Sequence, residues 1–309
     1  MLADAIRILN FDGSLSQQDN LIRQFQPVIT DLKKIAPYCR HWMSAGTARK
    51  LKTPLDLRFK NSITFLGSGD FHHISSLLIE QFSMPLSVIV FDHHPDWDIL
   101  PPKFGCGSWV SRILEKQNIV KVILLGTSSE DISWPGIQSA NLASLKDNRM
   151  EIYPYSHGPT RVLFRKVPEN ISIKSKRGLC YSDIYWQELK NSNISDFFPQ
   201  LIKRIATPQV YVSIDKDCLR SAYSLTNWEE GSFELEDLLT MLKLIRKNFD
   251  IVGLDITGDY SPAQALGKIK TLFSRLDHPQ DYTAKGRPEA LINSLNEHTN
   301  TAILQALKS

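Results

Sequence analysis

The chain has few cysteines, no long apolar run and no cluster of charges of one sign. Its four cysteines, Cys39, Cys106, Cys180 and Cys218, are widely spaced and form no CxxC pair, which argues against a disulfide framework or a zinc–thiolate site. The longest apolar runs, such as LSVIVF, are too short to span a bilayer, and the amino terminus lacks the pattern of a secretory signal. We therefore expect a cytoplasmic protein with reduced thiols and no membrane partner.

The charge balance excludes another class of partner. The chain of 309 residues carries 36 basic and 33 acidic residues, a net charge of +3, and the two signs are interspersed. No Lys/Arg run marks a surface for nucleic acid or an anionic membrane. With 42% hydrophobic and 22% charged residues, the composition is that of a globular protein with a substantial core. A small molecule is therefore the expected partner.

Short β-branched runs alternate with longer amphipathic stretches along the chain. The runs that predict strands are residues 5–12, 62–67, 86–92, 121–126, 150–155, 178–183, 209–215 and 250–256. The stretches that predict helices include residues 75–82, 108–117, 194–205, 233–248 and 288–307. Continuous apolar strands separated by helices indicate a parallel sheet covered on both faces. We expect a single α/β domain over residues 1–309, a three-layer α/β/α sandwich with a mostly parallel sheet and a helical tail at about residues 262–309.

Acidic and imidazole residues follow four of these predicted strands. They lie in residues 68–73, 92–98, 215–217 and 255–259. In open parallel sheets, ligands bind in the crevice outside the carboxyl ends of the strands. Four separate segments are therefore expected to deliver carboxylates and imidazoles to one edge of the sheet.

The spacing of these residues predicts a metal site. In an extended segment, residues two apart project to the same side, so Asp92, His94 and Asp96 point together, as do Asp215 and Asp217. Either segment alone fits a solvated loop or a helix cap, but together they place four carboxylates in one crevice. Two divalent cations would balance that charge, with Asp92 and Asp215 as bridges. Carboxylates with an imidazole and without thiolate suit Mn²⁺.

These segments resemble motifs of the arginase/agmatinase/formiminoglutamase family, the ureohydrolases. That family carries GGDH, DAHxD, SxDxDxxDP and GLDIxE in this order. The corresponding stretches here are 69–72 (GDFH), 92–96 (DHHPD), 213–217 (SIDKD) and 253–258 (GLDITG), and the resemblance spans roughly residues 5 to 262. Phe71 is inserted between the Asp and the His of the first motif. The alignment makes His72 the ligand there, with His73 as the alternative.

The resemblance implies a ligand set, an arginase-like fold and a chemistry. One metal ion would be held by His72, Asp92, Asp96 and Asp215, and the second by Asp92, His94, Asp215 and Asp217. In this family the ions are Mn²⁺ and activate a water that attacks a guanidinium or amidine carbon. Asp217 would orient that water and accept its proton. Homo-oligomers, trimers or hexamers, are common in the family and are expected here by analogy.

The chain departs from the family where the substrate is bound. Cys106 stands where the family has a His that acts as a proton shuttle or substrate contact, and is the aligned candidate for a catalytic role. Gly258 stands where the family has a Glu that pairs with the guanidinium, and Asp259 follows it. Asp259 and Trp228, with the neighbouring Glu229 and Glu230, are candidates for a rebuilt substrate pocket.

Three functions follow from this pattern. The leading hypothesis is a hydrolase with two metal ions that cleaves a C–N bond in a small amidine, guanidine or amide, but is not an arginase itself. A second is a metal-binding protein of arginase fold without hydrolytic activity. A third is a deacetylase-like amidohydrolase. Loss of the guanidinium Glu changes the expected substrate more than the expected metal site.

Overall fold

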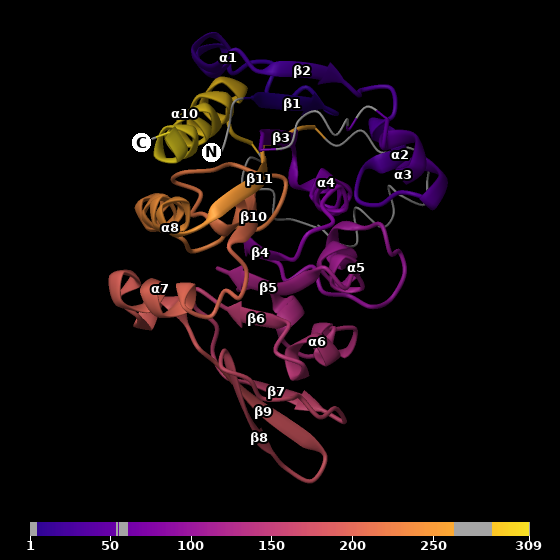
Figure 1. Cartoon of the computed structure of the whole chain (residues 1–309), viewed down its shortest axis with the longest axis vertical. Helices are drawn as coiled ribbons and strands as arrows, with labels where there is room; N and C mark the ends of the chain where they lie inside the picture. The colour runs from indigo at the N-terminus through magenta and orange to yellow at the C-terminus, as the bar shows by residue number, and fades with distance from the viewer. Residues whose placement is uncertain (1–4, 54, 56–60, 263–285, 309) are drawn as a thin grey trace.

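A sheet of eight parallel strands forms the centre of the molecule. The computed structural model describes residues 5–53, 55, 61–262 and 286–308, and Figure 1 shows the sheet with helices on either side. The strand order is β2-β1-β3-β11-β10-β4-β5-β6. The strands are β1 (Ile6–Asn10), β2 (Val28–Asp31), β3 (Ile63–Gly67), β4 (Leu86–Phe91), β5 (Ile119–Leu125), β6 (Met150–Tyr153), β10 (Gln209–Asp215) and β11 (Asp250–Thr257).

Helices cover both faces of this sheet, so the three-layer arrangement is confirmed. In β4, Val88 and Val90 belong to one buried apolar cluster, whereas Ile89 and Phe91 belong to a second cluster on the opposite face. Both faces are apolar because both are packed against helices. The described helices are α1 (Asp19–Phe25), α2 (Ala36–Cys39), α3 (Ala45–Leu51), α4 (Ile74–Ile79), α5 (Trp109–Leu114), α6 (Leu142–Lys146), α7 (Ile194–Ile202), α8 (Leu235–Asn248) and α10 (Glu289–Lys308).

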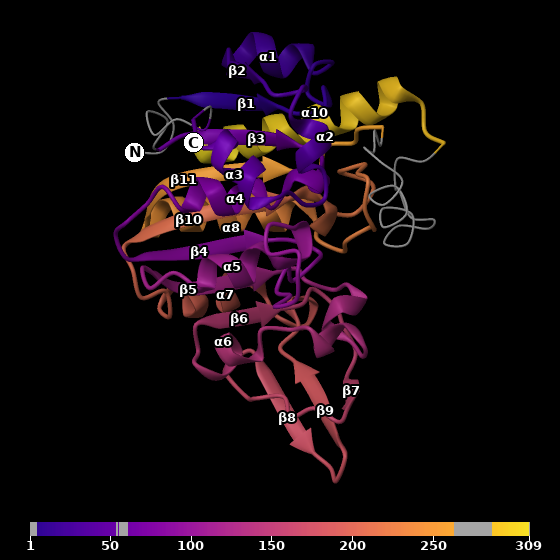
Figure 2. The same cartoon turned by 90° about the vertical axis from the view of Figure 1, so that its right-hand side faces the viewer.

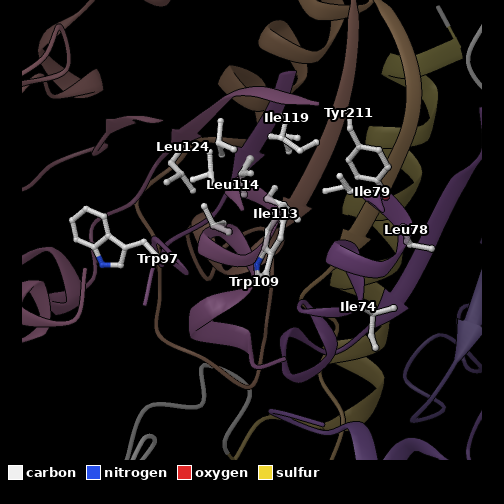
Figure 3. Packing of buried hydrophobic residues seen from close by; sticks show 14 of the residues in the cluster. Ile74, Leu78, Ile79, Trp97, Trp109, Ile113, Leu114, Ile119, Leu124 and Tyr211 are labelled. Carbon is white, nitrogen blue, oxygen red and sulfur yellow. The ribbon is translucent and has the colours of Figure 1, made fainter. Parts of the chain in front are cut away.

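The two helical layers are built from different parts of the chain. Helices α4, α5 and α6 lie on one side of the sheet, and α7, α8 and α10 on the other (Figure 1). Figure 3 shows part of the first layer, with Trp109 and Ile113 of α5 and Tyr211 of β10 among the packed side chains. All three side chains are buried in the same cluster. Helix α5 is therefore fixed against the sheet close to the strands that carry the predicted metal ligands.

The structure differs from the sequence prediction in two places. The run at residues 178–183 was expected in the main sheet, but β9 (Tyr181–Trp186) pairs antiparallel with β7 (Thr160–Leu163) and β8 (Ile173–Arg177) in a small separate sheet. Buried and more exposed residues alternate along β9, as expected when one face meets solvent. Strand β2 was not predicted, because it is only four residues long and those residues are mostly exposed at the sheet edge. Of the predicted helical tail at residues 262–309, residues 263–285 lie outside the described part.

Four central strands position the candidate site. β3, β11, β10 and β4 are neighbours and run parallel, as Figure 2 shows. Their carboxyl ends therefore meet at one edge of the sheet, and the segments that follow them share one crevice. No helix within the described ranges is long and apolar enough to cross a membrane.

Candidate metal centre

Six acidic and imidazole side chains meet at the carboxyl ends of these strands. They are His72 after β3, Asp92, His94 and Asp96 after β4, and Asp215 and Asp217 at the end of β10. All six line one cavity, and all but the half-buried His94 are buried. The structure thus brings together every residue for which the sequence predicts a role as metal ligand.

His72 faces three carboxylates with one edge of its ring. Its Nδ1 atom lies 3.1 Å from Asp92 Oδ2, 3.4 Å from Asp96 Oδ2 and 3.5 Å from Asp215 Oδ2. On the other edge of the ring, Nε2 is 2.8 Å from Ser213 Oγ. The imidazole is therefore held through Nε2, while Nδ1 faces the acidic cluster.

His94 lies between two further carboxylates. Its Nδ1 atom is 2.9 Å from Asp217 Oδ2 and 3.7 Å from Asp92 Oδ1, and its Nε2 is 2.9 Å from Glu229 Oε2. The contact between Nε2 and Glu229 is the arrangement by which carboxylates orient the histidines that ligate metals. Nδ1 of His94 thus faces the same acidic cluster as Nδ1 of His72.

The donor atoms fit divalent cations. His72, Asp92 and Asp96 form one group, and Asp92, His94 and Asp217 another, with the donor atoms of each group within 4.8 Å of one another. Asp92 belongs to both groups, as a bridging ligand does. Its Oδ2 atom is buried and has no hydrogen-bond partner among the described residues. A buried carboxylate oxygen without a donor is costly unless a cation is bound to it. Carboxylate and imidazole donors are those that Mn²⁺ accepts.

The charges of the cluster perturb each other. Burial and the charge of Asp92 raise the pKa of Asp96 to about 7 and that of Asp217 to about 6. Burial and the charge of Asp217 raise the pKa of Asp215 well above its ordinary value. Although burial opposes the charged imidazolium, the neighbouring carboxylates of Asp92 and Asp96 raise the pKa of His72. Without a cation, protons must therefore balance part of the negative charge.

Of the two candidate histidines, His72 belongs to a group of side chains that could hold a metal ion. His73 is also buried, and its Nδ1 atom is 3.4 Å from the thiol of Cys106. The Cys106 thiol also donates to the backbone oxygens of Asp70, at 3.3 Å, and Gly69, at 3.5 Å. Burial raises the pKa of this thiol well above its ordinary value. Cys106 lines the cavity, but as a neutral thiol held by backbone oxygens.

Gly258 and Asp259 have a different relation to the site from the expected one. Gly258 has φ +88°, and a Cβ atom there would lie 2.5 Å from Asp215 Oδ1. The chain therefore has no room for a side chain at this position. Asp259 is buried, forms an ion pair with Lys216 at 2.9 Å and is not part of the cavity lining. This position does not support the role in substrate binding that the sequence predicted for Asp259.

Supporting residues escaped the sequence analysis. Trp109 Nε1 donates to Asp96 Oδ2 at 2.6 Å, which holds that carboxylate against helix α5. On β10, Tyr211 and Ser213 both donate to Asp255 of β11, at 2.6 Å each. The signal for this pair was present, because Tyr211 and Ser213 are polar residues two apart in an otherwise apolar strand and so share the face of Asp215.

The cavity above the cluster is roomy and has aromatic and acidic walls. Its volume is ≈ 570 Å³, within the range of small-molecule sites. Trp228 lies in its wall, with Nε1 3.1 Å from Asp70 Oδ1 and the ring centroid 5.1 Å from that of His94. Beyond the metal-site aspartates, the carboxylates in the lining are Asp98, Asp131 and Glu229. The described lining contains no lysine or arginine.

Comparison with known proteins supports the assignment of the fold. No protein-family model matches the chain. A protein of Thermotoga maritima described as uncharacterized is 28% identical over 267 residues, 85% of this chain and 83% of that protein. Among solved structures, the arginase of Entamoeba histolytica in complex with L-ornithine superimposes with a TM-score of 0.60 at 11% identity, covering 99% of this chain and 98% of that one. Proclavaminate amidino hydrolase of Streptomyces clavuligerus gives 0.51 at 13% identity, covering 97% and 93%. At the level of the fold, the resemblance to the ureohydrolases is confirmed, and this chain is an arginase-like α/β/α protein of divergent sequence.

Proposed function

We propose that this protein is a metal-dependent hydrolase of a C–N bond in a small amidine or guanidine. The observation that supports this most strongly is the convergence of six histidine and aspartate side chains in one cavity, on a fold shared with amidino hydrolases. Four carboxylates and two imidazoles from three separate segments have no structural need to be adjacent and buried, and their repulsion must be offset. A pair of divalent cations offsets it.

The residues divide into two ligand sets that share two members. His72 and Asp96 would hold one ion, His94 and Asp217 the other, and Asp92 and Asp215 both. Mn²⁺ suits these donors. When bound, such a pair lowers the pKa of a water molecule and polarises the group under attack. Asp217 would orient the water and accept its proton, since it lines the cavity and lies beside His94.

The cavity walls favour a positively charged substrate over a neutral amide. Glu229 bonds to His94 through Oε2, and 41% of its side chain is exposed. Asp98 and Asp131 add negative charge to the same walls. A carboxylate beside the reacting carbon would pair with an amidinium or guanidinium N–H. Because the described lining contains no lysine or arginine, a carboxylate on the substrate would find no cationic partner there. These features weigh against arginine and against a deacetylase-like reaction.

A second candidate, metal binding without hydrolysis, has its own supporting observations. Cys106 is a poor acid or base at neutral pH because burial raises its pKa. Gly258 presents no group to a substrate. Both positions differ from the family motifs while the six candidate ligands are all present.

One experiment distinguishes the two candidate functions. Full-length protein loaded with Mn²⁺ would be incubated with a panel of guanidines, amidines and amides, and release of urea or ammonia measured. The matched control is Asp217→Asn, which keeps the size of the side chain but removes the proposed proton acceptor. We expect turnover of at least one cationic member by the wild type and a loss of at least about a hundredfold in the variant. Stoichiometric Mn²⁺ binding with no turnover across the panel would favour the second candidate.

A further inference from the structure

Lys216 is an unusual neighbour for a metal site. It lies between Asp215 and Asp217 in the short 3₁₀ turn η7 (Lys216–Cys218), and its side chain is fully buried. Lysine is seldom buried without a partner, because taking its charge out of water is costly. An ammonium next to two candidate ligands would compete with divalent ions for them. The fold must therefore direct this ammonium elsewhere.

Asp259 receives the ammonium and is itself held from several sides. Its Oδ1 atom is 2.9 Å from Lys216 Nζ and accepts a hydrogen bond of 2.7 Å from Gln18 Nε2. Asn300, on the carboxyl-terminal helix α10, donates from Nδ2 to Oδ1 and Oδ2 at 3.2 and 3.3 Å. The backbone N–H of Asp259 donates to Gly67 at the end of β3. The carboxylate is thus fixed by residues from segments near both ends of the chain, and it is not part of the cavity lining.

Little separates Lys216 from Asp215 if this contact is lost. A Cβ atom at Gly258 would lie 2.5 Å from Asp215 Oδ1 and 3.0 Å from Lys216 Cβ, so the glycine leaves the two residues adjacent. Asp215 already attracts the ammonium electrostatically. A freed lysine side chain has four flexible methylene groups and can turn to a neighbouring carboxylate. An ammonium paired with Asp215 would neutralise a bridging ligand and repel a second cation.

We propose that Asp259 is a positioning residue that holds the Lys216 ammonium away from Asp215 and so keeps the metal centre open to divalent cations. Asp259 then acts on the site through Lys216, without touching metal or substrate. This inference rests on the proposed metal centre and not on the proposed reaction. It also gives a role to a lysine that nothing in the hydrolytic chemistry uses.

The proposal is tested by Mn²⁺ binding to four full-length proteins, measured by titration calorimetry after removal of metal. They are the wild type, Asp259→Asn, Lys216→Met and the double variant. Asp259→Asn should weaken Mn²⁺ binding by about tenfold or more, since the freed ammonium competes for Asp215. The double variant should bind within about threefold of the wild type, because the competing charge is gone. Lys216→Met alone should bind no more weakly than the wild type.

The rescue separates positioning from simple structural damage. If the double variant binds as weakly as Asp259→Asn, or if Asp259→Asn binds as the wild type does, the proposal is wrong. Should Asp259→Asn fail to fold, Asn300→Leu removes two hydrogen bonds to Asp259, and its weaker Mn²⁺ binding should again be reversed by Lys216→Met.

A partly buried lysine elsewhere in the sheet, Lys121, provides the control. Lys121 pairs with Glu151 at 2.7 Å on strands β5 and β6, so Lys121→Met should lower the melting temperature without changing Mn²⁺ affinity. If Lys121→Met weakened Mn²⁺ binding as much as Asp259→Asn does, the weaker binding would be due to lower stability, and the proposal would be wrong. A wild-type protein that binds no Mn²⁺ would overturn the metal centre itself, whereas binding without turnover would leave this inference intact.

Discussion

His72 and Ser213 are joined by a contact of 2.8 Å between Nε2 and Oγ. Ser213 donates its own hydroxyl proton to Asp255 Oδ1 at 2.6 Å, so its oxygen accepts from the His72 ring. The N–H of His72 is then on Nε2, and the lone pair of the neutral ring is on Nδ1, toward Asp92. A metal ligand needs this tautomer. The buried hydrogen-bond chain thus prepares the ring for a cation.

Removal of the serine hydroxyl should therefore weaken metal binding. We predict that Ser213→Ala raises the dissociation constant for Mn²⁺ by about tenfold or more, as the loss of such an outer contact does in other metal sites. Titration calorimetry with the metal-depleted protein measures this. Ser87→Ala is the matched control, because Ser87 is buried in β4 and accepts a hydrogen bond from Thr207 away from the cluster. Equal affinities in Ser213→Ala and the wild type would contradict the proposed role of His72.

Metal should stabilise the folded protein through its bridging ligands. At Mn²⁺ a hundredfold above the dissociation constant, we expect an increase of about 2.7 kcal/mol in the free energy of unfolding. Asp215→Ala should abolish most of the corresponding rise in melting temperature. Asp98→Ala should keep it, because Asp98 lines the cavity but bonds to Ser139 Oγ outside the two ligand groups. Thermal scans with and without Mn²⁺ test this, and equal losses in both variants would mean that the ligand set is misassigned.

The stability of the metal-free protein should fall as pH rises from about 4, the ordinary pKa of an aspartate, to about 8. The pKa of Asp96 is raised from 3.8 to about 7 by burial and by Asp92, and carboxylates raise the pKa of His72 and His94. A group whose pKa is raised in the folded state keeps its proton at a pH where the same group in the unfolded chain has lost it. Its contribution to the free energy of unfolding therefore disappears as the pH rises through the folded-state pKa. Bound Mn²⁺ requires the deprotonated groups, so the trend should reverse on loading. Melting temperatures at several pH values, with Mn²⁺ and with chelator, measure both slopes; parallel slopes would contradict the prediction.

The arrangement of the core and the cluster was largely predictable because local patterns specify both. Buried strands such as β4 are continuous apolar runs, and His94 follows one of them at a spacing of two from Asp92. Spacing alone did not choose between His72 and His73, because the inserted Phe71 changes the register. In the structure Phe71 is buried and stacks on Phe11, and the 3₁₀ turn before His72 places that residue in the site.

Contacts between distant segments were not predictable from the sequence. Lys216 and Asp259 are far apart in the chain, and their pairing depends on the register of β10 and β11. The positive φ of Gly258 cannot be inferred from a glycine at a strand end. The role expected for Asp259 followed from its proximity to Gly258 in the sequence, whereas in the structure the chain turns at the glycine and directs the carboxylate away from the cavity.

Glu229 should determine the preference for positive charge. We predict that Mn²⁺-loaded wild type binds benzamidinium at least about tenfold more tightly than the neutral isostere benzamide, and that Glu229→Gln removes most of this ratio. The glutamine oxygen can still accept from His94 Nε2, so Mn²⁺ affinity should change little. Asp131→Asn is the control, since Asp131 is an exposed carboxylate of the same cavity without a contact to His94. Calorimetry gives the ratio of benzamidinium to benzamide affinity for each protein. If the ratio fell equally in Glu229→Gln and Asp131→Asn, the preference would reflect only the overall charge of the cavity.

Arginine should be a negligible substrate, and restoring a glutamate at position 258 should not change that. At φ +88° a side chain is strained, by about 1–3 kcal/mol, and its Cβ atom would lie 2.5 Å from Asp215 Oδ1 and 2.7 Å from the backbone nitrogen of Lys216. Gly258→Glu should therefore displace Asp215 and weaken Mn²⁺ binding before any new carboxylate meets a guanidinium.

Urea release from arginine, measured together with Mn²⁺ affinity, tests this prediction. Gly158→Glu is the matched control, because nothing lies within 4 Å of a Cβ atom at Gly158 and the variant should bind Mn²⁺ as the wild type does. Efficient urea release by the wild type would contradict this interpretation of the cavity, in which no described lysine or arginine meets the substrate carboxylate, but not the metal assignment. Activity gained in Gly258→Glu with unchanged Mn²⁺ affinity would show that the strand end can accommodate a side chain, and the strain argument would be wrong.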